Sequence, residues 1–193
     1  MAGLLLAAGA GSRLGQPKAL VRIGGLTLGE RGLALLRGGG ADPVVVVTGA
    51  VPVRLDGVIT VHNPDWPAGM GSSLRIGLSA LPARVDAVVI ALVDQPLIGA
   101  DAVRRLIAAY HAGAENAVAC YQGMPRNPVL LSKAYWAEAA ESAHGDTGAR
   151  AFLRSHPGLV TAVECGDVGR PDDLDTQQDL DNIASLLAER EPG

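Results

Sequence analysis

The chain has 193 residues, of which 48% are apolar and only 3% are aromatic, so we expect one domain over residues 1–193 with an aliphatic core. Its net charge of −4 argues against a nucleic-acid-binding surface. The longest apolar run, residues 87–93, is too short to span a membrane, and the N-terminus has no basic leader segment. The sequence therefore predicts a cytoplasmic protein whose two distant cysteines are free thiols.

Along the chain, short aliphatic runs typical of buried strands alternate with segments of helical periodicity. Runs such as VVVV at 44–47 and AVVIALV at 87–93 indicate a sheet covered by helices on both faces. Strands are expected, in chain order, at 3–7, 44–48, 58–61, 87–93, 117–121, 129–131 and 160–164. Helices are expected around Leu74, Leu78 and Leu81, between Asp101 as N-cap and Gly113 as terminator, and around Leu180, Ile183, Ala184 and Leu187. The predicted fold class is a three-layer α/β architecture with a mostly parallel central sheet.

The first expected strand runs into a loop of small residues that is followed by two cations. Residues 4–20 read LLLAAGAGSRLGQPKAL, in which Gly9 and Gly11 allow positive φ angles and close approach of an anion to the backbone. Arg13 supplies a fork of donors and Lys18 a point charge, a combination that suits a polyphosphate. The segment predicts a nucleoside triphosphate site, although glycines at a strand-to-helix turn also serve packing alone.

Two better-known nucleotide motifs do not fit this loop. A P-loop needs a lysine directly after its last glycine, whereas Gly15 is separated from Lys18 by Gln16 and Pro17. The dinucleotide fingerprint needs a third glycine where this chain has Leu14, together with an acidic residue further on that holds a ribose. No acidic residue stands at that place, so a nicotinamide-dependent oxidoreductase is disfavoured.

Acidic residues follow two later segments at the expected carboxyl edge of the sheet, where ligands of such folds bind. Asp94 comes directly after the apolar run 87–93, and Asp173 and Asp175 alternate shortly before the last expected helix. A triphosphate requires a hard cation with oxygen ligands, so Asp94 and one of the later pair are candidate ligands of Mg²⁺. Alternatively, these acids only cap the next turn and the last helix, which Thr176 is also suited to cap.

Five motifs, in the order found here, resemble the molybdenum cofactor cytidylyltransferases, a family within the Rossmann-like nucleotidyltransferases. They are LAAGAGSRLGQPK at 6–18, NPDWPAGMGSSL at 63–74, LVDQP at 92–96, GDTGAR at 145–150 and DLDTQQDL at 173–180. The first and third are shared by many nucleotidyltransferases, whereas the second and fourth are narrower. The resemblance covers nearly the whole chain and implies a Rossmann-like nucleotidyltransferase fold.

The resemblance also implies roles for the residues that match its motifs. Related guanylyltransferases usually have glycine where this chain has Ala8, which implies cytosine as the base. The metal ligands would be Asp94 and Asp175, and the catalytic residues Arg13, Lys18 and Asp94. Nucleotide and acceptor would be bound by residues of three motifs: Leu6, Ala7, Ala8, Gly9, Gly11, Ser12, Asn63, Gly69, Met70, Ser72, Ser73, Asp146 and Arg150.

Two of these roles have local alternatives, and one position departs from the family pattern. Ser72 could equally be the N-cap of the helix around Leu74, and Asp146 and Arg150 a helix-start cap and an ion pair. Many family members have histidine where this chain has Asn127, which offers hydrogen bonds but does not titrate near neutral pH. The preceding Arg126 is a candidate for an acceptor phosphate, or else a plain surface arginine.

These readings predict a Mg²⁺-dependent enzyme that transfers CMP from CTP to the terminal phosphate of molybdopterin. Its partners would be CTP, molybdopterin or the molybdenum cofactor, and a molybdenum hydroxylase as recipient, with no nucleic acid and no membrane. One alternative is a related enzyme that uses GTP or another phosphorylated acceptor. Another is a carrier that binds the molybdenum cofactor without catalysis.

Overall fold

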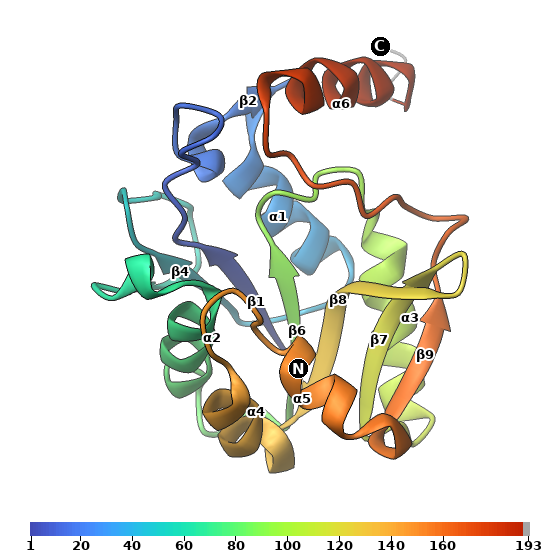
Figure 1. The fold of residues 1–193 in the computed structure, drawn as a ribbon. Helices are drawn as coiled ribbons and strands as arrows, with labels where there is room; N and C mark the ends of the chain where they lie inside the picture. Colours follow the sequence, from blue (N-terminus) through green and yellow to red (C-terminus); the bar gives the residue numbers. More distant parts are fainter. Residues whose placement is uncertain (191–193) are drawn as a thin grey trace.

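A seven-stranded sheet forms the centre of the computed structural model, which describes residues 1–190 (Figure 1). The strand order is β5-β4-β1-β6-β8-β7-β9, and β8 is antiparallel to both of its neighbours whereas the other pairings are parallel. The predicted mostly parallel α/β sheet is therefore confirmed. The strands are β1 (Ala2–Ala7), β4 (Val44–Thr48), β5 (Ile59–His62), β6 (Ala87–Leu92), β7 (Asn116–Tyr121), β8 (Met124–Ser132) and β9 (Val160–Glu164).

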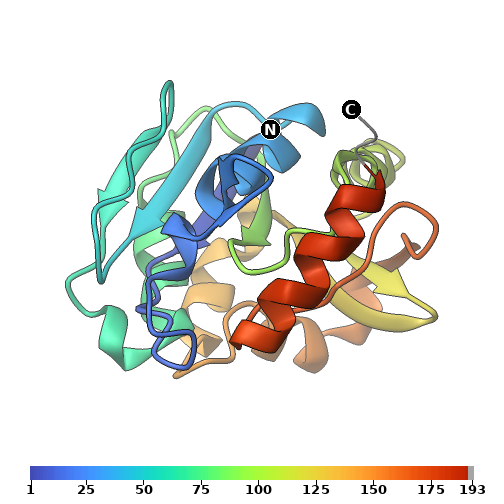
Figure 2. The same ribbon diagram turned by 90° about the horizontal axis from the view of Figure 1, so that it is seen from above.

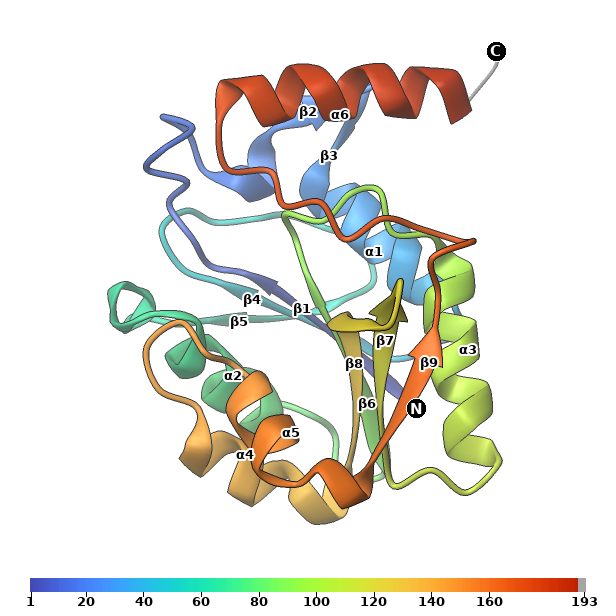
Figure 3. The ribbon, with the colours of Figure 1, turned by 45° about the vertical axis from the view of Figure 1, so that its right-hand side comes forward.

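Helices cover both faces of this sheet, as its apolar strands predict (Figure 3). One face carries α1 (Leu28–Gly38) and α3 (Ala100–His111), and the other carries α2 (Met70–Ser79), α4 (Trp136–Ser142) and α5 (Arg150–Ser155). The last helix, α6 (Gln177–Arg190), crosses the end of the sheet toward which β6 and β9 point (Figure 1). No helix within residues 1–190 is long and apolar enough to cross a membrane.

The two-residue period of the strands divides the core into two layers. In β1, Leu5 packs into the cluster beneath α1 and α3, while its neighbours Leu4 and Leu6 pack into the cluster beneath α2, α4 and α5. All six residues of β1 are buried. Because both faces of the strand are covered, its sequence is apolar throughout instead of alternating. Phe152 of α5, the chain's single phenylalanine, is fully buried in the second cluster.

Several predicted boundaries are wrong for local reasons. Strand β8 begins at Met124, five residues before the predicted start, because it continues an antiparallel hairpin with β7 through a polar, proline-containing segment. A small hairpin of β2 (Arg22–Ile23) and β3 (Leu26–Thr27) was not predicted. Asp101 is not the N-cap of α3, since that position is Gly99 and Asp101 pairs with Arg104 inside the helix. Leu81 lies beyond the end of α2 but is still part of the core.

A segment near the C-terminus is bound across the carboxyl ends of the central strands. This segment, residues 169–176, is the last part of the connection from β9 to α6, which Figure 2 shows from above. The Leu174 N–H donates to the Asp94 carbonyl at 2.9 Å, and the Arg170 N–H donates to the Leu97 carbonyl at 3.2 Å. The side chain of Leu174 is fully buried. These contacts fix the segment against the loop after β6 and thereby place its acidic residues beside that loop.

Candidate active site

The loop after β1 takes its shape from Gly11. Its φ angle is +64°, and a Cβ atom added there would lie 2.0 Å from the carbonyl oxygen of Gln16. The Gly11 carbonyl accepts a hydrogen bond from the Leu14 N–H at 3.0 Å, which closes the turn. Gly9 does not use a positive φ, and a Cβ atom there would meet nothing within 4 Å. The loop therefore needs glycine at Gly11 for its own backbone, whereas Gly9 leaves open space above the chain.

We predict that Gly11→Ala destabilises the protein much more than alanine at two other glycines of the loop. Gly15 also has a positive φ, of +76°, but a Cβ atom there meets nothing within 4 Å, so Gly15→Ala should cost only the left-handed strain of about 1–2 kcal/mol. Gly11→Ala adds a steric clash to that strain, and Gly9→Ala adds neither. Urea unfolding of the three variants measures the order. Equal stability of Gly11→Ala and Gly15→Ala would contradict the role assigned to Gly11.

Lys18 lies between two acidic side chains from distant parts of the chain. Its Nζ donates to Asp94 Oδ2 at 2.7 Å and to Asp175 Oδ1 at 2.5 Å. Burial by itself lowers the pKa of the Lys18 ammonium, but the charge of Asp94 and the hydrogen bonds to Asp175 and Asp94 outweigh this and hold the pKa above its ordinary value. Arg13 lies at the edge of the cluster, with its guanidinium 3.7 Å from Asp175 and its side chain 78% exposed.

Two neighbours of Asp175 in the chain, Asp173 and Thr176, have hydrogen-bond partners of their own. Asp173, two positions earlier, accepts a hydrogen bond from Gln95 Nε2 at 2.8 Å. Burial raises the pKa of Asp173, and so do the charges of Asp94 and Asp175, while the Gln95 bond opposes them. Thr176 Oγ1 accepts from the Asp179 N–H at 3.2 Å at the start of α6, the capping role predicted for it. Lys18 thus contacts Asp94 and Asp175, and Asp173 lies close enough for the charges of these two carboxylates to raise its pKa.

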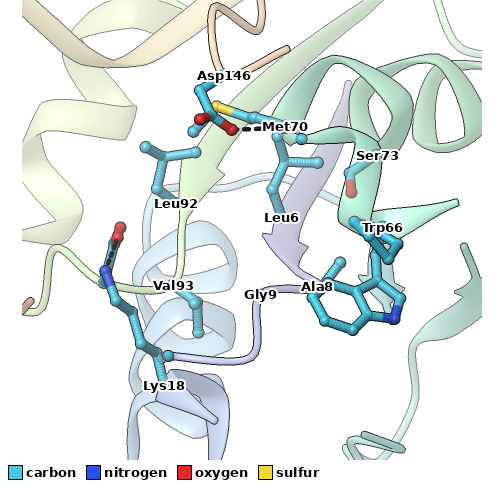
Figure 4. A pocket seen from close by; sticks show the side chains of 14 residues that line it. Leu6, Ala8, Gly9, Lys18, Trp66, Met70, Ser73, Leu92, Val93 and Asp146 are labelled. Atoms are coloured by element: carbon cyan, nitrogen blue, oxygen red, sulfur yellow. Dashed lines mark hydrogen bonds and ion pairs between the residues drawn. The ribbon is translucent and has the colours of Figure 1, made fainter. Parts of the chain in front are cut away.

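A cavity of about 320 Å³ lies beside the cluster (Figure 4). The predicted residues in its wall come from β1 and the loop after it, the loop after β6, the start of α2 and the loop before α5. Figure 4 shows Lys18 and Trp66 on opposite sides of the cavity. Trp66, in the short helix η2 (Trp66–Ala68), was not singled out from the sequence, although it stands inside the second motif. The predicted residues that line the cavity are Leu6, Ala8, Gly9, Gly11, Lys18, Gly69, Met70, Ser73, Asp94 and Asp146.

The predicted binding residues that do not line this cavity are Ala7, Ser12, Asn63, Ser72 and Arg150. Ala7 is buried at the end of β1. Asn63 is buried, and its side-chain amide donates to Ser72 Oγ at 2.8 Å and to Ser73 Oγ at 3.0 Å. Ser72 is not the N-cap of α2, because Gly69 occupies that position and Ser72 Oγ donates back to the Gly69 carbonyl at 2.8 Å. Asn63 and Ser72 therefore brace the wall that Ser73 lines. Ser12 lies exposed on the loop.

A smaller cavity of about 160 Å³ adjoins the same carboxylates on the side toward β8. Asp94 and Asp175 line it together with Asn127 and with four residues of the GDTGAR motif, among them Asp146 and Arg150. Asp146 Oδ1 accepts from the Met70 N–H at 3.4 Å, so it connects its loop to the start of α2 and is not a cap of its own helix. No ion pair joins Asp146 to Arg150 within residues 1–190, which leaves the Arg150 guanidinium free.

The carboxylates at the cluster suit a divalent cation only if a bound phosphate ligand and water supply further oxygen atoms. Within residues 1–190 no three His, Cys, Asp or Glu side chains are arranged to hold a metal ion. Asp94 and Asp175 nevertheless provide two carboxylates, with Asp173 adding negative charge. Mg²⁺ in phosphate sites is bound by one or two carboxylates and completes its octahedron with phosphate oxygens and water. The residues present fit Mg²⁺ on that condition.

The fold and this site define an α/β protein with a cavity at the carboxyl edge of its sheet. A glycine loop, a lysine and two carboxylates lie beside that cavity. Residues 3–160 match the MobA-like NTP transferase domain, and the chain belongs to that family. The sequence resemblance to nucleotidyltransferases is thereby confirmed at the level of the family.

Four known proteins illustrate this membership. The chain is 36% identical to nicotine blue oxidoreductase of Paenarthrobacter nicotinovorans, over 92% of this chain and 93% of that protein. It is 36% identical to a molybdenum cofactor guanylyltransferase of Rhodobacter capsulatus, over 60% and 62%. A crystal structure of an Rv0371c homologue from Mycobacterium sp. strain JC1 superposes with a TM-score of 0.87 at 33% identity, covering 98% of both chains. Rv0371c of Mycobacterium tuberculosis in complex with manganese gives 0.78 at 28% identity, over 95% and 97%.

Proposed function

We propose that this protein transfers CMP from CTP to the terminal phosphate of molybdopterin. An oxygen of the acceptor phosphate forms a bond to the α-phosphorus of CTP. The bond between that phosphorus and the oxygen bridging to the β-phosphate breaks, and this oxygen leaves with the electron pair as part of pyrophosphate. The observation that carries the proposal is the Lys18–Asp94–Asp175 cluster, which adjoins both cavities at the mouth of the glycine loop.

The residues of the chain act in this reaction mainly by alignment and charge. The acceptor phosphate is already ionised near pH 7, because its second pKa is about 6, so no general base is needed. Lys18 and Arg13 would neutralise charge on the α-phosphoryl group and on pyrophosphate. To do this, the Lys18 ammonium has to leave at least one of its two carboxylates and turn toward the phosphates. Arg150, free in the smaller cavity, would hold the acceptor phosphate.

Asp94 and Asp175 would hold Mg²⁺ once Lys18 has moved and nucleotide phosphates complete the coordination. When bound, the ion neutralises triphosphate charge and helps to orient the reacting groups. The structure of Rv0371c in complex with manganese supports the proposal that this protein binds a divalent cation. Occurrence in the cytoplasm, where CTP is available, and a molybdenum hydroxylase as recipient are parts of the same proposal.

The choice of CTP rests on Ala8, which lines the cavity of about 320 Å³. Guanylyltransferases usually have glycine at this position. The guanylyltransferase relative favours GTP as the competing donor. We expect pyrophosphate release in Mg²⁺ with CTP, and not with GTP, ATP or UTP, and only when purified molybdenum cofactor is present. Release with GTP alone would retain the reaction and overturn the base. Cofactor binding without release from any nucleotide would favour a carrier.

A second candidate function comes from the relative named nicotine blue oxidoreductase, which matches nearly the full chain. Under this reading, the protein would reduce an organic substrate with a nicotinamide cofactor. The broken dinucleotide fingerprint at Leu14 and the cluster of Lys18 with two carboxylates favour the transferase. Incubation with NADH or NADPH and nicotine blue, followed by absorbance of the reduced cofactor, separates the two: cofactor oxidation without pyrophosphate release from any nucleotide would replace the transferase proposal.

A further inference from the structure

A third cavity, of about 490 Å³, lies between α5 and the three strands β7, β8 and β9. Its volume falls within the range of about 300–1,000 Å³ that is typical of small-molecule sites. The apolar part of its wall includes Met124, which is 57% exposed at the tip of the β7–β8 hairpin, and Leu153 of α5. The cavity therefore offers an apolar surface large enough for a ring system.

Three arginines, Arg126, Arg150 and Arg154, line this cavity, and no acidic residue is among its lining residues. Within the part of the chain that the structure describes, five arginine side chains make no hydrogen bond or ion pair: these three together with Arg54 and Arg84. Three of these five described arginines thus converge on one cavity of a protein whose net charge is −4. Free guanidinium groups on an apolar wall suit a ligand that is both anionic and apolar.

The cavity shares two lining residues with the smaller cavity at the carboxylates. Arg150 and Val129 line both, and the smaller cavity also contains Asp94 and Asp175. A molecule whose phosphate lies at Arg150, next to the carboxylates, therefore lies beside the 490 Å³ cavity, which has room for its body. Arg126 and Arg154 line the 490 Å³ cavity and not the smaller one, so they would contact groups of the ligand other than the reacting phosphate.

The β7–β8 hairpin that forms one side of this cavity is fixed to the neighbouring strand. The Glu164 carboxylate at the end of β9 accepts hydrogen bonds from the N–H groups of Gly166 at 2.9 Å, Gln122 at 3.2 Å and Gly123 at 3.3 Å. These bonds, that of Gly166 first, hold the pKa of Glu164 below its ordinary value. Met124 and Arg126 therefore project from a hairpin whose turn is tied down, and the cavity has a defined rim.

From these observations we infer that the cavity between α5 and the β7–β8–β9 strands binds the body of the phosphate acceptor, and that this acceptor carries a second anionic group held by Arg126 and Arg154. The acceptor class is a phosphorylated molecule with a ring body and at least one further acidic group. The inference rests on the proposed function for its reaction, while the binding site itself is independent of catalysis.

The test uses the double variant Arg126→Gln/Arg154→Gln and the matched control Arg54→Gln/Arg84→Gln. Both remove two free arginines, but the control residues lie outside the cavity. The binding probe is 8-anilinonaphthalene-1-sulfonate, an aromatic anion whose fluorescence rises in apolar sites. We expect its affinity to fall at least about tenfold in the test variant, since hydrogen bonds to charged groups are involved, and to stay within twofold in the control. Equal affinities in both variants, with unchanged melting temperatures, would overturn the site.

A kinetic measurement then tests the site's role toward the acceptor. With CTP and molybdopterin, the test variant should show a KM for molybdopterin raised at least about tenfold, with the KM for CTP and kcat within twofold of the wild type. An unchanged KM for molybdopterin would overturn the assignment to the acceptor. Absence of turnover in the wild-type protein would instead refute the proposed reaction, and the sulfonate titration would still decide whether the anion site exists.

Discussion

Replacement of Asp94 by asparagine is expected to remove most of the turnover while the protein remains folded. Asparagine retains the size of the side chain but loses the charge that would hold Mg²⁺, and we expect kcat to fall about 10²–10³-fold, which corresponds to about 3–4 kcal/mol. The fold should survive because the Asp94 backbone carbonyl, not its carboxylate, accepts the hydrogen bond from Leu174. The measurement is pyrophosphate release at saturating CTP and acceptor over a Mg²⁺ series, with urea unfolding of the same preparation.

The matched control for this variant is Asp172→Asn in the segment that carries Asp175. Asp172 pairs with Arg170 at 3.1 Å and is not part of the cluster around Lys18, so its loss should leave kcat within about twofold. A rate near that of the wild type for Asp94→Asn in saturating Mg²⁺ would refute Asp94 as a metal ligand. Loss of activity accompanied by an equal loss of stability would show a structural role in its place.

Removal of the Lys18 side chain, in Lys18→Ala, is the second large effect we predict. Loss of one preorganised group that stabilises charge in a transition state typically lowers kcat about 10²–10³-fold. The affinity for CTP should change much less, because the cavity walls and the loop after β1 would still bind the nucleotide. Lys18 also separates Asp94 from Asp175, so the variant leaves two facing carboxylates, and added Mg²⁺ should stabilise it more than it stabilises the wild type.

Lys133→Ala provides the control, since Lys133 is the chain's other lysine and its ammonium contacts the Ala83 carbonyl far from the site. Single-turnover kinetics with CTP, combined with calorimetric titration of the nucleotide, separate chemistry from binding. If Lys18→Ala weakens CTP binding and leaves the single-turnover rate unchanged, Lys18 positions the nucleotide and does not act on the transition state. Equal melting temperatures with and without Mg²⁺ would contradict the expected effect on Asp94 and Asp175.

Patterns that are local in the chain account for most of what was predicted correctly. Residues 44–48 and 160–164 were predicted as strands and are β4 and β9, because runs of β-branched residues between turn residues leave little choice of structure. Such patterns fail where the pairing between strands decides the structure. Strand β8 extends through Pro125 and Arg126 because the β7–β8 turn brings them opposite Cys120 and Ala119. The local sequence there has no strand signature.

The residues of the candidate site likewise fall into those that local patterns predict and those that they do not. The loop residues Gly9 and Gly11 and the residue Asp94 after β6 could be named from the sequence, since small residues and carboxylates directly after apolar strands mark the ligand-binding edge of a parallel sheet. The roles of Asn63 and Ser72 in bracing the wall could not, because a buried amide hydrogen-bonded to two serines differs from a ligand-binding one only in where it points. Trp66 was missed because a single aromatic residue in a loop has no periodic signal.

The apolar strands, the mostly parallel sheet covered on both faces, the glycine loop and the family could all be inferred from the sequence, because each depends on neighbouring residues and the burial they require. The position of Lys18 between Asp94 and Asp175, and the convergence of Arg126, Arg150 and Arg154 on one cavity, became visible only in the folded chain. Lys18 and Asp175 are 157 positions apart, and their contact depends on how the segment before α6 docks on the loop after β6. Such contacts arise from the packing of whole elements, which no short stretch of sequence encodes.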